Sequence, residues 1–339
     1  MRKRTLFLAG SASRIKRIMF VLAIIILLIF AAKLIVSAYH TKMTSVEKGV
    51  VFWEKNVGKW SRDDVEKYVK KIAAREIRQP IDAEIDLANK MIVPEVSGMR
   101  IDVDATVEKI MDAEPHEKVL PLYRQINARI KWDDYPALPA SRGNPNEKCV
   151  SLMINVAWGE EYLSELLSVL RDENVKATFF ITGKWAEKNQ KWVQKIAGDG
   201  HELGSHGYSD AEVMTDLNND EIEKSLLATN EILYEASGKE PKYFTPHKGE
   251  YNQLVLEIVA RNSMRTVLWS LDTVDWRDQI EKMESSIKEN VKGGDIILMH
   301  PTRDISELLT RILPFMKEEG LHVVTVDEHL SSFPFFDGP

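Results

Sequence analysis

From residue 148 onward, short apolar runs alternate with segments in which apolar residues recur at helical spacing. The run Cys149–Ala157 comes first, and the leucines of Tyr162–Asn174 then fall about one helical turn apart. Six further runs continue the alternation: Ala177–Ile181, Glu202–Ser205, Tyr243–Thr245, Thr266–Ser270, Ile296–Met299 and His322–Thr325. Apolar strands separated by helices are typical of a parallel sheet covered by helices. The pattern predicts an α/β fold over residues 148–330, a deformed (β/α) barrel of about seven parallel strands.

The chain before this region shows a different, mixed pattern. Asp63–Arg75 carries apolar residues on one helical face, and Ile81–Leu87 alternates apolar with polar residues, as a half-buried strand does. The short helix Asp104–Met111 and the strand Val119–Ile126 are expected to follow. These elements predict a small α+β module over residues 48–130. Residues 131–147 lack a hydrophobic period and contain three prolines, which predicts a linker.

The N-terminal region has the pattern of a membrane segment. Residues 18–38 are almost entirely apolar, and about 20 such residues suffice to cross a bilayer as a helix. Residues 1–17 hold basic and no acidic side chains, so the positive-inside rule places them in the cytoplasm and the main body outside. The small residues Val36-Ser37-Ala38 also suit signal cleavage, which would give a secreted protein. The long apolar run and Lys33 favour an uncleaved, single-pass anchor in the cell membrane.

Charge and cysteine content narrow the function classes. The net charge is −7, and the first 42 residues contribute +8, so the remaining residues sum to −15. An acidic main body argues against a nucleic-acid partner, because phosphate binding needs a basic surface. Cys149 is the only cysteine in the sequence. An intramolecular disulfide and a thiolate metal cluster are therefore excluded.

The chemistry of a (β/α) barrel lies where its strands end, at their carboxyl ends. The segments expected there are Asn155–Gly159, Gly204–Asp210, Phe244–Tyr251, Trp269–Trp276 and Leu298–His300. Together with Val175–Gly183, this series resembles the polysaccharide deacetylases, the carbohydrate esterases that share the NodB-homology domain. The resemblance covers residues 148 to about 330, with all five family motifs in order.

This resemblance implies a function and a set of roles. The family removes N-acetyl groups from glycans such as peptidoglycan or chitin, using a divalent metal (Zn, Co or Mn). Its first motif supplies a general-base Asp and a metal-ligand Asp, and its second, His-x-x-x-His, supplies two imidazole ligands. An Arg of the third motif and an Asp beside the Trp of the fourth support the base. The His of the fifth motif is the general acid.

The sequence departs from the family pattern at most of these positions. Asn155 stands at the base, Val156 falls at the metal-ligand Asp, and Ala157 offers no ligand either. His206 matches the first imidazole, but Asp210 replaces the second. Thr245 replaces the supporting Arg, whereas four family positions are kept: Pro246, Asp275, Trp276 and His300. The pair Trp158-Gly159 resembles a sporulation-associated branch of the family.

The remaining polar and aromatic residues allow two interpretations each. His206 and Asp210 could hold Zn, Co or Mn weakly, or could simply hydrogen-bond each other. His247 could supply an imidazole from another direction, or could line the groove. The aromatic residues at the strand ends could form a platform for sugar rings, or belong to the core: Trp158, Tyr208, Trp269 and Trp276.

The module over residues 48–130 carries a resemblance of its own. Val57–Ser61, Pro94–Gly98 and Ile101–Ala105 resemble motifs of the peptidoglycan-binding module found before some cell-wall enzymes, and a bare spacer is the alternative. The whole chain is thus expected to be an exported, membrane-anchored deacetylase-family protein acting on cell-wall glycan. Its site is expected to be catalytically impaired, as in a pseudoenzyme or glycan-binding protein. An active metal-dependent N-deacetylase with a noncanonical site is the alternative. Metal-free ester hydrolysis lacks a suitably placed nucleophile.

Overall fold

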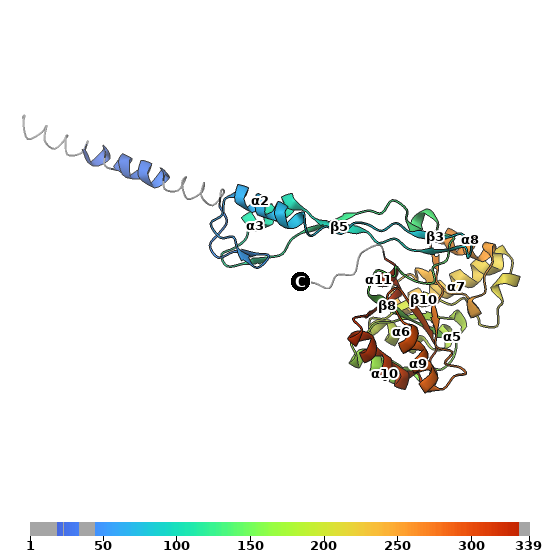
Figure 1. Ribbon diagram of the computed structural model, residues 1–339. Coiled ribbons are helices and arrows are strands. Elements are labelled where there is room, and N and C mark those ends of the chain that lie inside the picture. The colour runs from blue at the N-terminus through green and yellow to red at the C-terminus, as the bar shows by residue number, and fades with distance from the viewer. Residues whose placement is uncertain (1–18, 23, 34–44, 332–339) are drawn as a thin grey trace, which may run out of the picture. The chain divides into compact units, whose positions relative to one another are not determined.

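The computed structural model describes residues 19–22, 24–33 and 45–331 (Figure 1). Residues 19–22 and 24–33 are helical with mostly exposed side chains, and the rest of the expected membrane span lies outside the described residues. No helix within these ranges is both long and apolar enough to cross a bilayer. The chain divides into two compact units, Met1–Arg78 with Met99–Gln125, and Gln79–Gly98 with Ile126–Pro339.

The first unit is built on two amphipathic helices, α2 (Arg62–Ala73) and α3 (Val103–Met111). Each helix begins at a polar cap, because Ser61 and Asp102 accept hydrogen bonds from backbone N–H groups of the first turn. The buried faces of the helices share one hydrophobic cluster, which confirms both predicted helices. Small sheets complete the unit: β1 (Val51–Phe52), β2 (Lys55–Asn56) and β6 (Lys118–Val119) in one, and β5 (Gly98–Ile101) with β7 (Tyr123–Ile126) in another.

The second unit contains a parallel sheet of eight strands in the order β12-β11-β10-β9-β8-β14-β13, with β15 also pairing with β8. The strands are β8 (Cys149–Val156), β9 (Thr178–Ile181), β10 (Glu202–Ser205), β11 (Tyr243–Phe244), β12 (Arg265–Thr266), β13 (Leu271–Asp272), β14 (Ile296–Met299) and β15 (His322–Val324). Helices connect successive strands except β12 and β13, as expected for parallel pairing. The predicted deformed (β/α) barrel is confirmed.

One predicted strand was wrong in its extent. The run Thr266–Ser270 is not a single strand, because β12 pairs with β11 whereas β13 pairs with β14 at the other end of the sheet order. Between them the backbone of Ala140 accepts from Leu268 N–H at 2.8 Å and donates to the Thr266 carbonyl at 3.1 Å. The apolar run therefore crosses between the two ends of the sheet order, where β12 and β13 do not pair with each other.

The main core of this unit lies between the sheet and its outer helices. The helices are α4 (Leu163–Asp172), α5 (Gly183–Lys188), α6 (Gln190–Gly198), α7 (Asn219–Ser237), α8 (Gln253–Arg261), α9 (Ile280–Asn290), α10 (Ile305–Glu318) and α11 (Val326–Leu330). The leucines of α4 and the apolar face of α10 pack with one face of β8 in a single hydrophobic cluster. This packing fixes which side chains of β8 point inward.

The hairpin of β3 (Glu84–Asp86) and β4 (Met91–Val93) groups with the second unit by its contacts. Its residue Ile92 is buried, and the Ile92 N–H donates to the Pro139 carbonyl at 3.0 Å. Trp132 is also buried, with its indole N–H donating to the Leu138 carbonyl at 2.9 Å. Residues expected in the small module and in the linker thus contribute to the core of the second unit.

Candidate functional site

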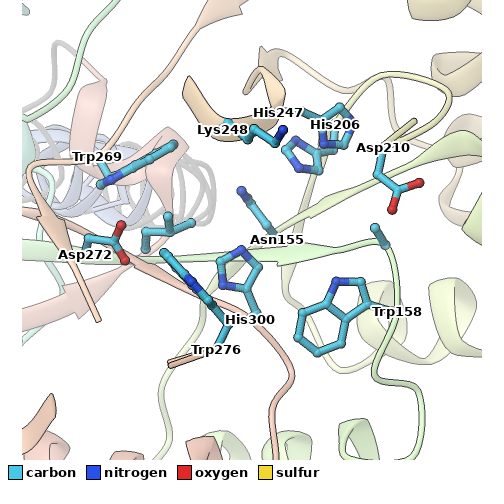
Figure 2. A pocket seen from close by; sticks show the side chains of 12 residues that line it. Asn155, Trp158, His206, Asp210, His247, Lys248, Trp269, Asp272, Trp276 and His300 are labelled. Carbon is cyan, nitrogen blue, oxygen red and sulfur yellow. The ribbon is translucent and has the colours of Figure 1, made fainter. Parts of the chain in front are cut away.

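A pocket of about 570 Å³ opens at the carboxyl ends of the barrel strands (Figure 2). Its lining comes from segments far apart in the sequence: Asn155, Ala157, Trp158, His206, Asp210, His247, Lys248, Trp269, Asp272, Trp276, Leu298 and His300. Strand-end segments supply this lining, as the sequence pattern predicted. A concave, partly aromatic pocket with a few converging polar groups is typical of a binding or catalytic site.

The strand β8 places Asn155 in the pocket and Val156 outside it. Successive side chains of a strand point to opposite faces, and Val156 is fully buried in the cluster that faces α4 and α10. Ala157, not Val156, lines the pocket. The assignment of position 156 to a metal ligand is therefore wrong for this fold, because a carboxylate there would enter the hydrophobic core. A ligand from this segment would have to come from position 157.

Asn155 occupies the centre of the pocket in Figure 2, between the imidazoles of His206 and His300. The side chain is nearly buried, and its Oδ1 has no hydrogen-bond partner among the residues that the structure describes. A carboxamide has no basic oxygen that could take a proton from water, whereas a carboxylate has. The pocket keeps the position expected for a general base but not its chemistry.

His300 keeps a complete supporting geometry. Its Nδ1 lies 2.9 Å from Asp275 Oδ1, and Asp275 Oδ2 accepts the backbone N–H of His300 at 2.6 Å. The Trp158 ring stacks on the imidazole with centroids 6.0 Å apart and planes 6° apart, and Trp276 meets it edge to face at 5.6 Å. A buried carboxylate that holds one imidazole nitrogen fixes the ring and leaves the other nitrogen to exchange protons. His300 therefore has the supporting contacts expected of the residue that the family resemblance assigns as general acid.

His206 and His247 form a pair of adjacent imidazole rings. The Nδ1–H of His206 donates to the Thr245 carbonyl at 2.7 Å, and the two ring centroids are 3.9 Å apart. The hydrogen bond of His206 therefore goes to Thr245, not to Asp210. Burial, reinforced by the neighbouring His247, holds the pKa of His206 well below its ordinary value. Burial also lowers the pKa of His247, against an opposing effect of Asp210, so both rings are neutral at pH 7.

These side chains are a poor fit for the divalent metal of the family. A carbonyl on Nδ1 leaves His206 Nε2 with a lone pair, and His247 Nε2 is buried without a partner among the described residues. Two imidazoles could thus contact one ion. The described part of the chain nevertheless contains no group of three His, Cys, Asp or Glu side chains arranged to hold a metal. Stable zinc sites in proteins use at least three protein ligands.

The structure leaves two predicted residues outside the pocket. The Tyr208 hydroxyl donates to Glu187 at 3.1 Å, and the Tyr208 N–H donates to the Ser225 hydroxyl at 2.9 Å. Pro246 is buried and precedes the 3₁₀ helix η3 (His247–Gly249) without lining the pocket. All other predicted site residues lie in the pocket lining except Asp275, which acts on it through His300.

Two polar residues of the pocket were not singled out from the sequence. Lys248 has a left-handed backbone with φ 55° inside η3, and Asp272 accepts the Val274 N–H at 2.8 Å. Burial raises the pKa of Asp272, although the Val274 N–H opposes the shift. Val274 is β-branched with φ 54°, a strained conformation of the kind that gathers at functional sites. The only signal for these residues was their place in strand-end segments.

Comparisons with known proteins show which family the chain belongs to. A family model described as "Polysaccharide deacetylase" matches residues 142–267, and one described as "Putative peptidoglycan binding domain" matches residues 42–118. The uncharacterized protein YlxY of Bacillus subtilis is 34% identical over 74% of this chain and 78% of its own length. A peptidoglycan-N-acetylglucosamine deacetylase of Bacillus cereus is 33% identical over 55% of this chain and 70% of its own. The chain belongs to the polysaccharide deacetylase family.

Several solved structures are similar in fold to this member of the polysaccharide deacetylase family. A family 4 carbohydrate esterase (CE4) pseudoenzyme from Bacillus anthracis is 30% identical with a TM-score of 0.68, covering 80% of this chain and 96% of that one. A mutant of that pseudoenzyme, described as having restored enzymatic activity, gives the same TM-score at 29% identity. A peptidoglycan N-acetylglucosamine deacetylase is 31% identical with a TM-score of 0.56, covering 59% and 96% of the two chains.

Proposed function

We propose that this chain binds N-acetylated cell-wall glycan in its barrel pocket and has a catalytically impaired N-deacetylase site. The observation that carries the proposal is Asn155, an amide at the centre of the pocket where the family has its general base. Removal of an acetyl group needs a base to deprotonate water and a group that stabilises the oxyanion. General-base catalysis alone contributes about 10²- to 10⁴-fold in rate.

The binding half of the proposal rests on the aromatic lining. Trp158 and Trp276 remain 43% and 56% exposed while flanking His300, and Trp269 lines the opposite side of the pocket. Exposed indole rings offer flat apolar faces with a polar edge, which suits the alternating C–H and O–H surface of a sugar. Three such rings around one pocket therefore support glycan binding.

We also propose that the chain is held at the outer face of the cell membrane. The apolar run 18–38, the basic segment 1–17 and the match to peptidoglycan-related families support an anchored, extracytoplasmic protein. The pair Trp158-Gly159 supports placing it with the sporulation-associated branch.

Metal analysis tests the impaired site directly. The full chain, purified in detergent micelles and dialysed against Zn, Co or Mn in turn, is expected to retain less than one ion per chain. The Bacillus cereus relative named a peptidoglycan-N-acetylglucosamine deacetylase would serve as the positive control. Stoichiometric retention of one metal, lost in His206→Ala, would contradict the proposal.

A second candidate function is an active deacetylase with an unusual metal site. The proximity of His206 to His247, with the Nε2 atom of His247 buried and unpartnered among the described residues, favours this candidate. It requires His247 as a replacement ligand, so His247→Ala would abolish both metal retention and acetate release. The impaired-site proposal expects neither signal in the unmodified chain.

A further inference from the structure

One face of α2 in the first unit combines aromatic rings with lysines. Trp60 and Tyr68 are partly exposed and meet edge to face, with centroids 5.5 Å apart and planes at 77°. They line a surface hollow of about 380 Å³ together with Asp64, Lys67 and Lys71. Residues 64, 67, 68 and 71 recur at helical spacing, so they share one face of the helix. The hollow is built entirely from the first unit.

The lysines of this hollow differ from their neighbours on the same helix. Lys70 forms an ion pair with Glu66 at 2.6 Å, whereas the described residues contain no ion pair to Lys67 or Lys71. The Nζ of Lys55 adds a third positive charge, 5.1 Å from the ring centroids of both Trp60 and Tyr68.

The only acid among the residues lining the hollow is already engaged. Asp64 Oδ2 accepts the Ser61 hydroxyl at 2.7 Å. In a main body that sums to −15, three lysines around one acid form a local positive surface.

We infer that this surface, the Trp60–Lys71 face (Lys55, Trp60, Lys67, Tyr68 and Lys71), binds peptidoglycan. A sugar ring would pack against the two aromatic rings, and free carboxylates of the stem peptides would pair with Lys67 and Lys71. Aromatic rings supply rigid, amphipathic contact area, and clustered lysines supply charge complementary to carboxylates. The inference rests on the proposed location at the cell wall, and it assigns the ligand to a defined surface of the module.

A purely structural role for the aromatic pair would not explain the lysines. Tyr68 also meets the buried Phe52 edge to face at 6.2 Å, so the Tyr68 ring contributes to the core. Removing Tyr68 would therefore confuse binding with folding. Lys67 and Lys71 are exposed and are not among the described residues that form the hydrophobic cluster of the first unit, so their replacement by glutamine tests binding without removing core packing.

The experiment uses the full chain in detergent micelles and purified sacculi stripped of teichoic acid. Cosedimentation is measured for the unmodified chain, for Lys67→Gln with Lys71→Gln, and for the charge-matched control Lys70→Gln with Lys109→Gln. Both control lysines are exposed residues of α2 and α3 outside the hollow. We expect the first double variant to bind at least about tenfold more weakly, a loss of about 1.4 kcal/mol, and the control to bind within about twofold of the unmodified chain. Sacculi with amidated stem carboxylates should bind the unmodified chain as weakly as they bind Lys67→Gln with Lys71→Gln.

Other outcomes overturn the inference. Equal losses in the two double variants would show that net charge, not this face, governs binding. Full binding by Lys67→Gln with Lys71→Gln would show that the face is not used. Binding that depends on teichoic acid would assign the face to a phosphate polymer instead.

A soluble probe separates this inference from the proposal for the barrel. Tetra-N-acetylchitotetraose is expected to bind the pocket, and Trp276→Ala should weaken that binding, whereas the loss of sacculi binding caused by Lys67→Gln with Lys71→Gln should persist in the Trp276→Ala background. If the unmodified chain does not bind the tetrasaccharide, the barrel proposal is wrong. If Lys67→Gln with Lys71→Gln does not weaken sacculi binding, the inference about the Trp60–Lys71 face is wrong.

Discussion

The direction of β8 gives a sharp prediction about position 156. Val156 is fully buried among apolar side chains, so Val156→Asp would place a carboxylate in the core without a partner. Loss of the buried valine costs about 1.5–3 kcal/mol, and desolvation of the carboxylate adds a penalty of several kcal/mol. The sum approaches the whole free energy of unfolding of a typical domain, about 5–15 kcal/mol. By contrast, Ala157→Asp faces the pocket and should cost less than about 1 kcal/mol.

The pH dependence separates a charge penalty from a packing defect. Burial would raise the pKa of an aspartic acid at 156, so the unfolded chain would release its proton more readily than the folded chain. Stability is then progressively lost as pH rises above the unfolded pKa of about 3.9, by about 1.4 kcal/mol per pH unit. Val156→Asn, similar in shape but uncharged, is the matched control and should show no such slope.

Urea unfolding followed by tryptophan fluorescence at pH 5, 6 and 7 measures these differences. The midpoint of Val156→Asp is expected to fall relative to that of Val156→Asn as the pH rises. If Val156→Asp unfolds at the urea concentration of the unmodified chain at every pH, the side chain at 156 faces water and the assignment of the pocket face of β8 is wrong.

Three further predictions concern the site and its support. The triple variant Asn155→Asp, Ala157→Asp, Asp210→His should bind one Zn or Co ion, as measured by calorimetry. The matched triple variant with Val156→Asp in place of Ala157→Asp should not bind the ion, because position 157 lines the pocket and position 156 does not. Trp158→Ala removes the ring stacked on His300 and should weaken binding of tetra-N-acetylchitotetraose by about tenfold, or about 1.4 kcal/mol, in a titration; unchanged affinity would remove Trp158 from the sugar platform. Burial lowers the pKa of His329 to about 4, and its Nδ1 lies 2.5 Å from the Ser151 hydroxyl. The unfolded chain therefore binds this proton more readily, so His329 contributes a loss of stability of about 1.4 kcal/mol per pH unit from about 6.5 downward to its folded pKa; the pH slope of His329→Gln should be smaller than that of the unmodified chain by this contribution.

Much of the barrel could be predicted from the sequence because its strands and helices are defined locally. Apolar runs and leucine spacing depend on neighbouring residues, so β8, β9, β14 and α4 lie close to their predicted ranges. The division of Thr266–Ser270 depends on which distant strand each end pairs with, and no local pattern records that choice. The same reason explains why the hairpin of β3 and β4 groups with the second unit although its sequence adjoins the first.

The site could be predicted as a set of segments but not side chain by side chain. Position 156 was assigned by its place in a motif, although the alternation of β8 already indicated that Asn155 and Val156 face opposite sides. Lys248 and Asp272 depend on the backbone turns at η3 and Val274, which place them in the pocket through left-handed conformations that the sequence does not specify. Tyr208 lies in a predicted segment, but its hydroxyl pairs with Glu187 outside the pocket.

Mass spectrometry of a glycan recovered from its complex tests the central claim most directly. The full chain is incubated with an excess of tetra-N-acetylchitotetraose and Zn, Co or Mn, the complex is isolated, and the bound sugar is released and analysed. We predict that the sugar is recovered bound and with every N-acetyl group intact, because the pocket keeps its tryptophans and His300 but carries Asn155 at the base. Recovery of sugar that has lost acetyl groups, with the loss abolished in His300→Ala, would contradict the account.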